Sequence, residues 1–201
     1  YIIFQVVIRM RKVCIDCGYG MKYEAFTALN TIEGNNNLTI GERVAKKISE
    51  IGFVVSMTRN NNEYVPLEER LRKIEYSKAK IAISIDANWS QNPNQKGVET
   101  YYGENSKSGD LLAKKIQKEL VMATQLYNRG FLPSSDKSHK GILYFTDSKV
   151  VTVITLIGFY SNPYERELRL QEKFRESASM AIIKGICKYF DINIKPHKIA
   201  K

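Results

Sequence analysis

The stretch Ile81-Ala-Ile-Ser-Ile-Asp-Ala-Asn-Trp89 decides the fold of this 201-residue chain. Its apolar run, residues 81–85, is typical of a strand buried on both faces, and the run stops at Asp86. Such strands occur mainly in parallel sheets that helices cover on both sides. The stretch therefore predicts an α/β fold, provided that further strands of this kind alternate with helices along the chain.

Strand-like and helical segments do alternate. Runs rich in β-branched and apolar residues predict strands at residues 12–16, 52–57, 98–102 and 150–157. Apolar residues at spacings of three and four predict helices at residues 38–51, 66–78, 108–124 and 172–190, the first with its N-cap within 35–37. We expect a single α/β domain with a mixed, mostly parallel sheet and helices on both faces, of the phosphorylase/hydrolase-like kind. It should span residues 13–191, between an N-terminal strand or anchor stub at 1–12 and a basic tail at 192–201.

Polar residues follow the apolar runs at three strand ends. Asp16 ends the first strand, Asp86 ends the run at 81–85, and a turn at residues 158–163 follows the last strand. In open parallel sheets, ligands bind outside the carboxyl ends of the strands. We expect these three ends to form one crevice.

The formal net charge of +10 should attract anions such as wall polymers, nucleic acid or anionic lipid. Lys and Arg are spread along the chain and form no basic stripe with interleaved aromatic residues, so we expect no nucleic-acid partner. The apolar start, residues 1–8, is shorter than the roughly 20 residues that cross a bilayer. We expect it to be an edge strand or the stub of a longer anchor.

The chain has three cysteines, Cys14, Cys17 and Cys187. The first two have the C-x-x-C spacing of redox and zinc sites, but no second pair of this kind follows. We expect thiols in or near the core. A disulfide between two of the three stays an open alternative.

Short motifs follow one another in a fixed order from about Val13 to Tyr189. They are Ile15-Asp-Cys-Gly-Tyr-Gly20, Glu33 five residues before Leu38, Met57-Thr-Arg59, Leu67-Glu-Glu-Arg70, Ser84-Ile-Asp-Ala-Asn88, Gly97-Val-Glu-Thr-Tyr-Tyr102, Arg129-Gly130 and Gly158-Phe-Tyr-Ser-Asn-Pro163. In this order and spacing the chain resembles the zinc-dependent N-acetylmuramoyl-L-alanine amidases. These enzymes cleave peptidoglycan between the lactyl group of muramic acid and the L-alanine of the stem peptide.

The resemblance implies a zinc site whose residues this chain has largely replaced. The two zinc-binding His positions of the family hold Tyr19 and Asp86 here, while the zinc-binding Glu is kept as Glu33. The position of the catalytic Glu holds Leu156. A catalytic zinc needs about three protein ligands, and the water it activates needs a base. We therefore expect no intact catalytic residue and no bound zinc.

Two other ways to build a metal site stay open. The carboxylates of Asp16, Glu33 and Asp86 together would suit a hard cation such as Mg²⁺ or Ca²⁺, because such ions prefer oxygen ligands. The thiols of Cys14 and Cys17 lie beside the first former ligand position and could contribute to a rearranged site. Without a cation, clustered carboxylates repel one another, and the pKa of at least one of them rises.

The remaining crevice residues are expectations from position. Asn88 lies two residues after Asp86, and His139 lies in a loop before an expected strand at residues 142–146. Thr146 stands where active members usually carry an Arg, which puts a substrate-anchoring contact in doubt. His197 lies in the polar tail, where we expect it to be solvated. Further family positions are predicted to form turns, caps and ion pairs: Arg59, Glu69, Arg70, Gly97, Glu99, Arg129 and Asn162.

Two functions follow from this resemblance. The first is a degenerate amidase that binds peptidoglycan, a muropeptide or a protein partner without hydrolysis. The second is an active, metal-dependent amidase with a rearranged site. Both imply an extracytoplasmic location at the cell wall or membrane, and neither predicts an oligomeric state.

Overall fold

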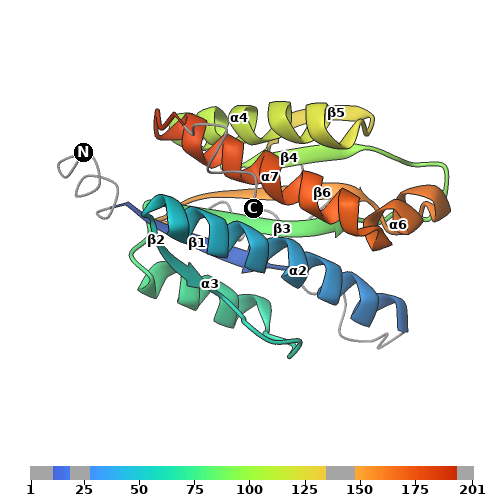
Figure 1. Cartoon of the computed structure of the whole chain (residues 1–201), viewed down its shortest axis with the longest axis horizontal. Coiled ribbons are helices and arrows are strands. Elements are labelled where there is room, and N and C mark those ends of the chain that lie inside the picture. The colour runs from blue at the N-terminus through green and yellow to red at the C-terminus, as the bar shows by residue number, and fades with distance from the viewer. Residues whose placement is uncertain (1–10, 19–27, 135–147, 194–201) are drawn as a thin grey trace.

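The computed structural model describes residues 11–18, 28–134 and 148–193, with the side chains of residues 28–32 left aside. Six strands form one sheet, and five helices pack on it (Figure 1). The strands are β1 (Lys12–Cys17), β2 (Val54–Met57), β3 (Ile81–Asn88), β4 (Val98–Tyr102), β5 (Asn128–Pro133) and β6 (Val151–Phe159). The helices are α2 (Ala28–Ile51), α3 (Leu67–Tyr76), α4 (Lys107–Thr124), α6 (Pro163–Leu170) and α7 (Glu172–Tyr189).

The sheet has the strand order β2-β1-β3-β6-β4-β5. All neighbouring strands are parallel except β4 and β6, which are antiparallel. The expected class, a single α/β domain with a mixed, mostly parallel sheet, is confirmed. The register sets Asp16 beside Ser84 and Asp86 beside Leu156, so β1, β3 and β6 bring the expected crevice residues to adjacent strands.

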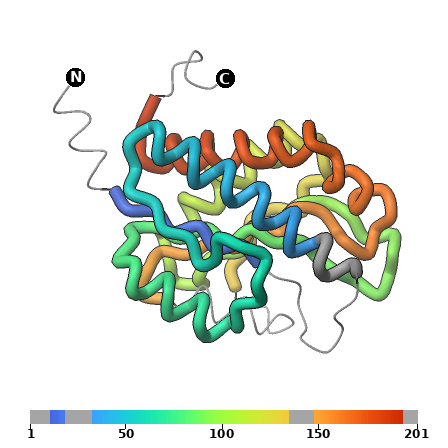
Figure 2. Tube along the Cα trace, turned by 60° about the horizontal axis from the view of Figure 1, so that its bottom comes forward, coloured from blue at the N-terminus to red at the C-terminus, as the bar shows by residue number. Residues whose placement is uncertain are grey.

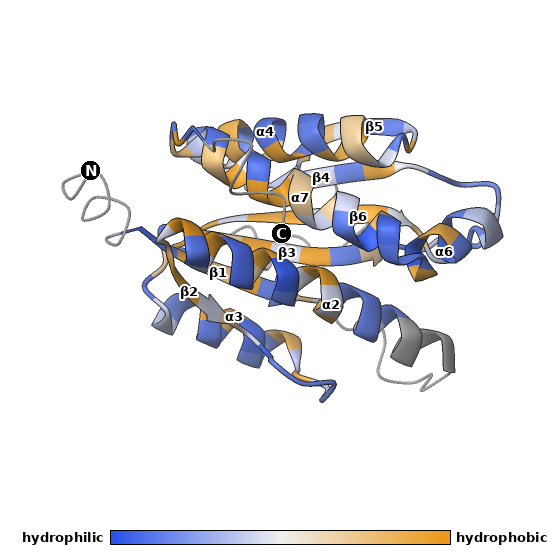
Figure 3. Ribbon diagram, in the orientation of Figure 1, coloured by the Kyte–Doolittle hydropathy of each residue, from blue (hydrophilic) through white to orange (hydrophobic). Residues whose placement is uncertain are grey.

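The larger apolar core lies between the sheet and the helices α2, α4 and α7 (Figure 1). It includes Ile15, Ile83 and Val153 from three neighbouring strands, and Ile182 and Ile186 from α7. These helices are apolar toward the sheet and polar toward solvent (Figure 3). The long helices are amphipathic because one side of each covers the apolar side chains of this sheet face, while the other side contacts solvent.

A smaller apolar cluster lies on the other face of the sheet, where α3 packs (Figure 2). It includes Cys14, Ala82, Ile154 and Leu156 from the strands and Ile74 from α3. These strand residues alternate with those of the larger core because successive side chains of a strand point to opposite faces. Helices therefore cover both faces, as the sequence predicts, but unequally.

Helix α2 packs closely on β1. A side chain at Gly41 would clash with the sulfur of Cys17, so only glycine lets the helix approach this near. This close packing fixes the start of α2 against the end of β1. Residues 33–37 thereby reach the carboxyl edge of the sheet.

Most predicted elements agree with the structure to within a few residues. Three differences stand out. The strand β5 and the helix α6 were not predicted, and α2 begins ten residues before the predicted start at 38. The N-cap prediction at residues 35–37 is wrong, because these residues lie inside α2. No helix in the described part of the chain is long and apolar enough to cross a membrane. The expectations for residues 1–10 and 194–201 fall outside the described residues.

Candidate functional site

Asp86 lies near the end of β3, next to the end of β1. Its Oδ1 accepts hydrogen bonds from the backbone N–H of Ala87 at 2.9 Å and from Asn37 Nδ2 at 3.2 Å. Its Oδ2 lies against Gly18, where any side chain would clash with it. Burial raises the pKa of Asp86, and the charge of Arg70 is the largest influence that opposes the rise. The carboxylate is thus fixed between an amide, a backbone N–H and a glycine.

Glu33, in the second turn of α2, contacts Asp86. Burial raises the pKa of Glu33 well above its ordinary value, the charge of Asp86 raises it further, and the charge of Arg169 opposes the rise. The two carboxyl groups share a hydrogen bond, which raises the pKa of Glu33 and lowers that of Asp86. Both carboxyl groups therefore have a pKa that is raised, chiefly by burial.

Arg169 supplies the positive charge of this site. Its side chain extends from α6 and is fully buried. One guanidinium nitrogen donates to Asn37 Oδ1 at 2.5 Å, and another donates to the carbonyl of Ile157. Burial lowers the pKa of Arg169, whereas the charges of Glu33 and Asp86 raise it. Asn37 links the cation to the anion, because its amide group also donates to Asp86.

The backbone after β1 is held by Arg59 and Asn37. Arg59 Nε donates to the carbonyl of Cys17 at 2.8 Å, and its NH2 donates to the carbonyl of Gly34 at 2.7 Å. The carbonyl of Gly18 accepts from Arg59 NH2 at 3.3 Å and from Asn37 Nδ2 at 3.0 Å. These bonds tie the end of β1 to the start of α2 and so place Glu33 beside the end of β3.

Asp16 has a structural role. It is fully buried and accepts hydrogen bonds from Thr58 Oγ1 at 2.5 Å, from Arg70 at 2.6 Å and from Ser84 Oγ at 2.6 Å. Both of its oxygens are therefore occupied. In the part of the chain that the structure describes, no three His, Cys, Asp or Glu side chains lie close enough together to hold a metal ion. These contacts give Asp16 partners other than a cation, so they lend no support to a cation shared by Asp16, Glu33 and Asp86.

Leu156 lies between Asp86 on β3 and Glu99 on β4 in the register of the sheet. Its side chain is buried, with 5% of its surface exposed, and it belongs to the smaller apolar cluster. Leucine has no group that accepts or donates a proton. The position that the resemblance assigns to the catalytic base therefore holds an apolar side chain that packs in the smaller cluster.

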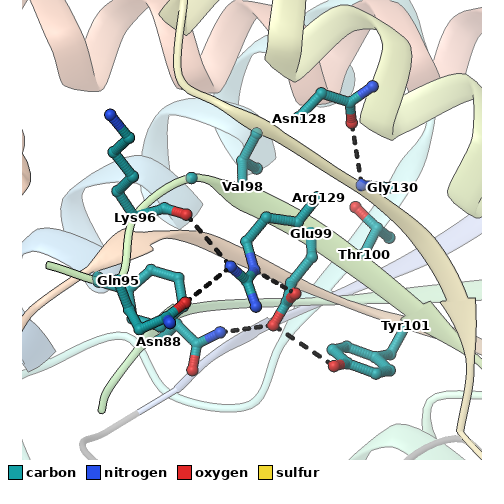
Figure 4. Close-up of polar contacts among 12 residues, drawn as sticks. Asn88, Gln95, Lys96, Val98, Glu99, Thr100, Tyr101, Asn128, Arg129 and Gly130 are labelled. Carbon is teal, nitrogen blue, oxygen red and sulfur yellow. Dashed lines mark hydrogen bonds and ion pairs between the residues drawn. The ribbon is translucent and has the colours of Figure 1, made fainter. Parts of the chain in front are cut away.

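Glu99 is the centre of a second polar cluster (Figure 4). Its Oε2 accepts from Arg129 Nε at 2.8 Å, and its Oε1 accepts from Asn88 Nδ2 and from the Tyr101 hydroxyl at 3.4 Å. Arg129 also donates to Gln95 Oε1 at 3.1 Å. The cluster joins the end of β3 to β4 and β5. Asn88, an expected crevice residue, therefore holds the sheet together here.

Several other family positions form the turns, caps and ion pairs that the sequence predicts. Asn162 caps α6, and Glu69 forms an exposed ion pair with Lys73. Gly97 has a φ of 110°, which favours glycine. A further residue, Glu165, was not predicted: its carboxylate accepts from the backbone N–H groups of Gly97 and Phe159, both at 2.7 Å.

The cysteine pair does not form a metal site. Cys14, Cys17 and Cys187 are free and buried, and the first two belong to apolar clusters on opposite faces of the sheet. Burial raises the pKa of Cys14 to about 11, and it raises the pKa of Cys17 even more. Since metals bind the thiolate form, neither residue is suited to a rearranged site. Four expected residues fall outside the described part of the chain: Tyr19, His139, Thr146 and His197.

The described residues do not fit the zinc ion that the resemblance implies. Catalytic zinc sites are built mainly from imidazole nitrogen and leave one position open. Here the two former ligand positions that the structure describes, Glu33 and Asp86, hold carboxyl groups, and a buried guanidinium is linked to Asp86 through Asn37. A metal cation at this site would be repelled by that guanidinium.

Three residues of this site, Arg169, Asn37 and Arg59, were not predicted to belong to it. Arg169 and Asn37 were not named from the sequence, and Arg59 was assigned only a general structural role. A charged residue on a short amphipathic helix usually faces solvent. No sequence pattern indicates that Arg169 is buried. Only the structure shows it, and Arg169 is the one Arg or Lys in the described part of the chain that is fully buried.

Comparisons with known proteins agree with this fold. The family model described as N-acetylmuramoyl-L-alanine amidase matches residues 13–188. The protein YqiI of Bacillus subtilis is 30% identical over 189 residues, which cover 92% of this chain and 87% of that protein. The amidase LytC of Bacillus subtilis is 26% identical, and the match covers 89% of this chain but 35% of LytC.

Among solved structures, the catalytic domain of CwlV, an N-acetylmuramoyl-L-alanine amidase from Bacillus (Paenibacillus) polymyxa var. colistinus, is similar along its whole length. The TM-score is 0.79 with 26% identity, and the match covers 92% of this chain and 100% of that domain. The chain belongs to the N-acetylmuramoyl-L-alanine amidase family.

Proposed function

We propose that this chain is a non-hydrolysing amidase domain of cell-wall metabolism that binds peptidoglycan. One observation carries the proposal: the position of the catalytic base holds Leu156, which is packed in an apolar cluster beside Asp86. General acid–base catalysis contributes about 10²–10⁴-fold to a typical reaction, and leucine contributes none of it. The raised pKa of Glu33 and the buried charge of Arg169 support the proposal, because both oppose metal binding.

The family fold supports peptidoglycan as the ligand, and the positive charge of the chain favours the anionic polymers of the wall. We therefore place its action outside the membrane, at the cell wall. A protein of the wall is the alternative partner. Pull-down with purified insoluble peptidoglycan decides between them, since a domain that acts only through a protein partner stays in the supernatant.

Zymography and metal analysis test the absence of hydrolysis. We expect the purified protein to give no clearing zone in a peptidoglycan gel, and to contain well under one zinc per chain by elemental analysis. The catalytic domain of CwlV, run in the same gel, is the positive control. Release of L-alanine-linked peptides, together with stoichiometric zinc and loss of activity with a chelator, would sink the proposal and favour an active enzyme with a rearranged site.

A further inference from the structure

The side chain of Arg169 is unusual in its surroundings. It is fully buried, and its guanidinium carbon lies 6.0 Å from the centre of the Tyr160 ring. It donates to Asn37 and to the carbonyl of Ile157, while its Nε has no hydrogen-bond partner among the described residues. A buried charge of this kind is costly unless an opposite charge offsets it. An anionic group close to Arg169 must therefore offset the cost of burying its charge.

That anionic group is the pair of carboxyl groups on Glu33 and Asp86. Among the charged groups that act on Arg169, Glu33 and then Asp86 act most strongly. Arg169 reaches it through Asn37, whose Oδ1 accepts from the guanidinium and whose Nδ2 donates to Asp86. Arg169 is thus the buried cation that acts on Glu33, and the charge of Arg70 also acts on Asp86.

We propose that Arg169 is the resident cation of this site, and that its charge excludes divalent metal ions from the former ligand positions. A divalent ion at Glu33 and Asp86 would be repelled by the guanidinium and would lack the oxygen of Asn37, which Arg169 occupies. Replacing Arg169 by an apolar residue frees that oxygen. The carboxyl groups of Glu33 and Asp86 then lose the positive charge of Arg169, and their oxygens suit a hard cation such as Ca²⁺. The inference rests on the metal-free site of the proposed function.

Arg169→Leu is the principal variant, and Arg169→Lys is its charge-retaining control. Without metal, we expect Arg169→Leu to lower the thermal midpoint by about 6–15 °C, because a buried charge pair loses one partner. Addition of CaCl₂ should raise the midpoint of Arg169→Leu in a saturable manner, as a ligand that binds only the folded state does. Wild type and Arg169→Lys should not respond to CaCl₂. The same titration with ZnCl₂ shows whether the freed site selects hard cations.

A charge cycle covers the case in which Arg169→Leu does not fold. The variant Glu33→Gln/Asp86→Asn keeps Arg169 without its counter-charge, and we expect a lower midpoint than in wild type. Adding Arg169→Leu to it removes all three charged or titrating groups, and we expect the midpoint to recover by several degrees with no response to CaCl₂. Equal midpoints with and without Arg169 in that background would overturn the proposal, as would one tightly bound metal ion per wild-type chain.

The outcomes separate this inference from the proposed function. A wild-type protein that hydrolyses peptidoglycan in the presence of a chelator overturns the proposed function and leaves the role of Arg169 intact. A folded Arg169→Leu protein that ignores CaCl₂, with wild type still inactive, overturns the role of Arg169 alone.

Discussion

At Glu33, protonation is coupled directly to stability. In the unfolded chain this residue ionises near pH 4.5, whereas burial and the charge of Asp86 raise its pKa well above that value in the folded protein. The folded state thus binds more protons in this interval, and Glu33 makes the free energy of unfolding fall as the pH rises through it. Glu33→Gln keeps a hydrogen-bond donor toward Asp86 and removes the titration. We expect the stability of this variant relative to wild type to increase as the pH rises above 4.5 in urea unfolding experiments.

Glu42→Gln is the matched control for this experiment. Glu42 lies on the same helix, α2, but its side chain is exposed. Its removal should leave the pH dependence of unfolding parallel to that of wild type. If the curves of Glu33→Gln and wild type were also parallel, Glu33 would not hold the proton in the folded state.

Sequence reasoning reached some residues of this site and not others, for a physical reason. The motif order located Asp86, Glu33 and Leu156, because strand ends and local spacing are visible in one dimension. The inward direction of Arg169 depends on how α6 packs over the end of β6, which no local pattern encodes. Asp16 was placed at the correct strand end, yet its three donors come from separate segments that only the fold brings together.

At the scale of elements, the turn between β6 and α6 holds the loop between β3 and β4. Asn162 Oδ1 accepts from the N–H of Glu165 at 3.1 Å and caps α6, while its Nδ2 donates to the carbonyls of Pro93 and Gln95 at 3.0 and 3.2 Å. Asn162→Ala removes both functions, and we expect it to lower the free energy of unfolding by about 1–2 kcal/mol. Hydrogen exchange should also become faster in residues 90–97.

Asn162→Asp separates the two functions. Aspartate still caps the helix, and its charge is favourable at a helix N-terminus, but it has no N–H to donate to the loop. We expect most of the stability to return while exchange in residues 90–97 stays fast. Exchange rates equal to wild type in this variant would show that the loop does not depend on Asn162.

The elements that sequence reasoning missed are those with weak local signals. The strand β5 contains Gly130 and Pro133, residues that sheets disfavour, and it lies at the edge, where such residues are tolerated. The helix α6 has eight residues and directly precedes α7, so its pattern merges with the next helix. By contrast, β4 was predicted with its observed bounds, because four of its five residues are β-branched or aromatic.

At the scale of the whole molecule, the sheet separates two apolar layers of unequal size, and each layer contains at least one cysteine. Cys14 lies in the smaller layer, while Cys17 and Cys187 lie in the larger one, and each has at most 1% of its surface exposed. Burial raises the pKa of Cys14 to about 11 and that of Cys187 to about 12. Thiol reagents attack the exposed thiolate, so these three residues can react only when their layer opens.

This arrangement predicts how the molecule unfolds. If the two layers form one cooperative unit, all three thiols should react with Ellman's reagent at a single rate, at least about a thousandfold slower than a free thiol, and at once in denaturant. The variant Tyr76→Cys places a thiol at a position on α3 that is 82% exposed, and this fourth thiol should react immediately in the native protein. Early labelling of Cys14 alone would contradict the prediction. It would mean that the layer under α3, which contains Leu156, opens independently of the larger core.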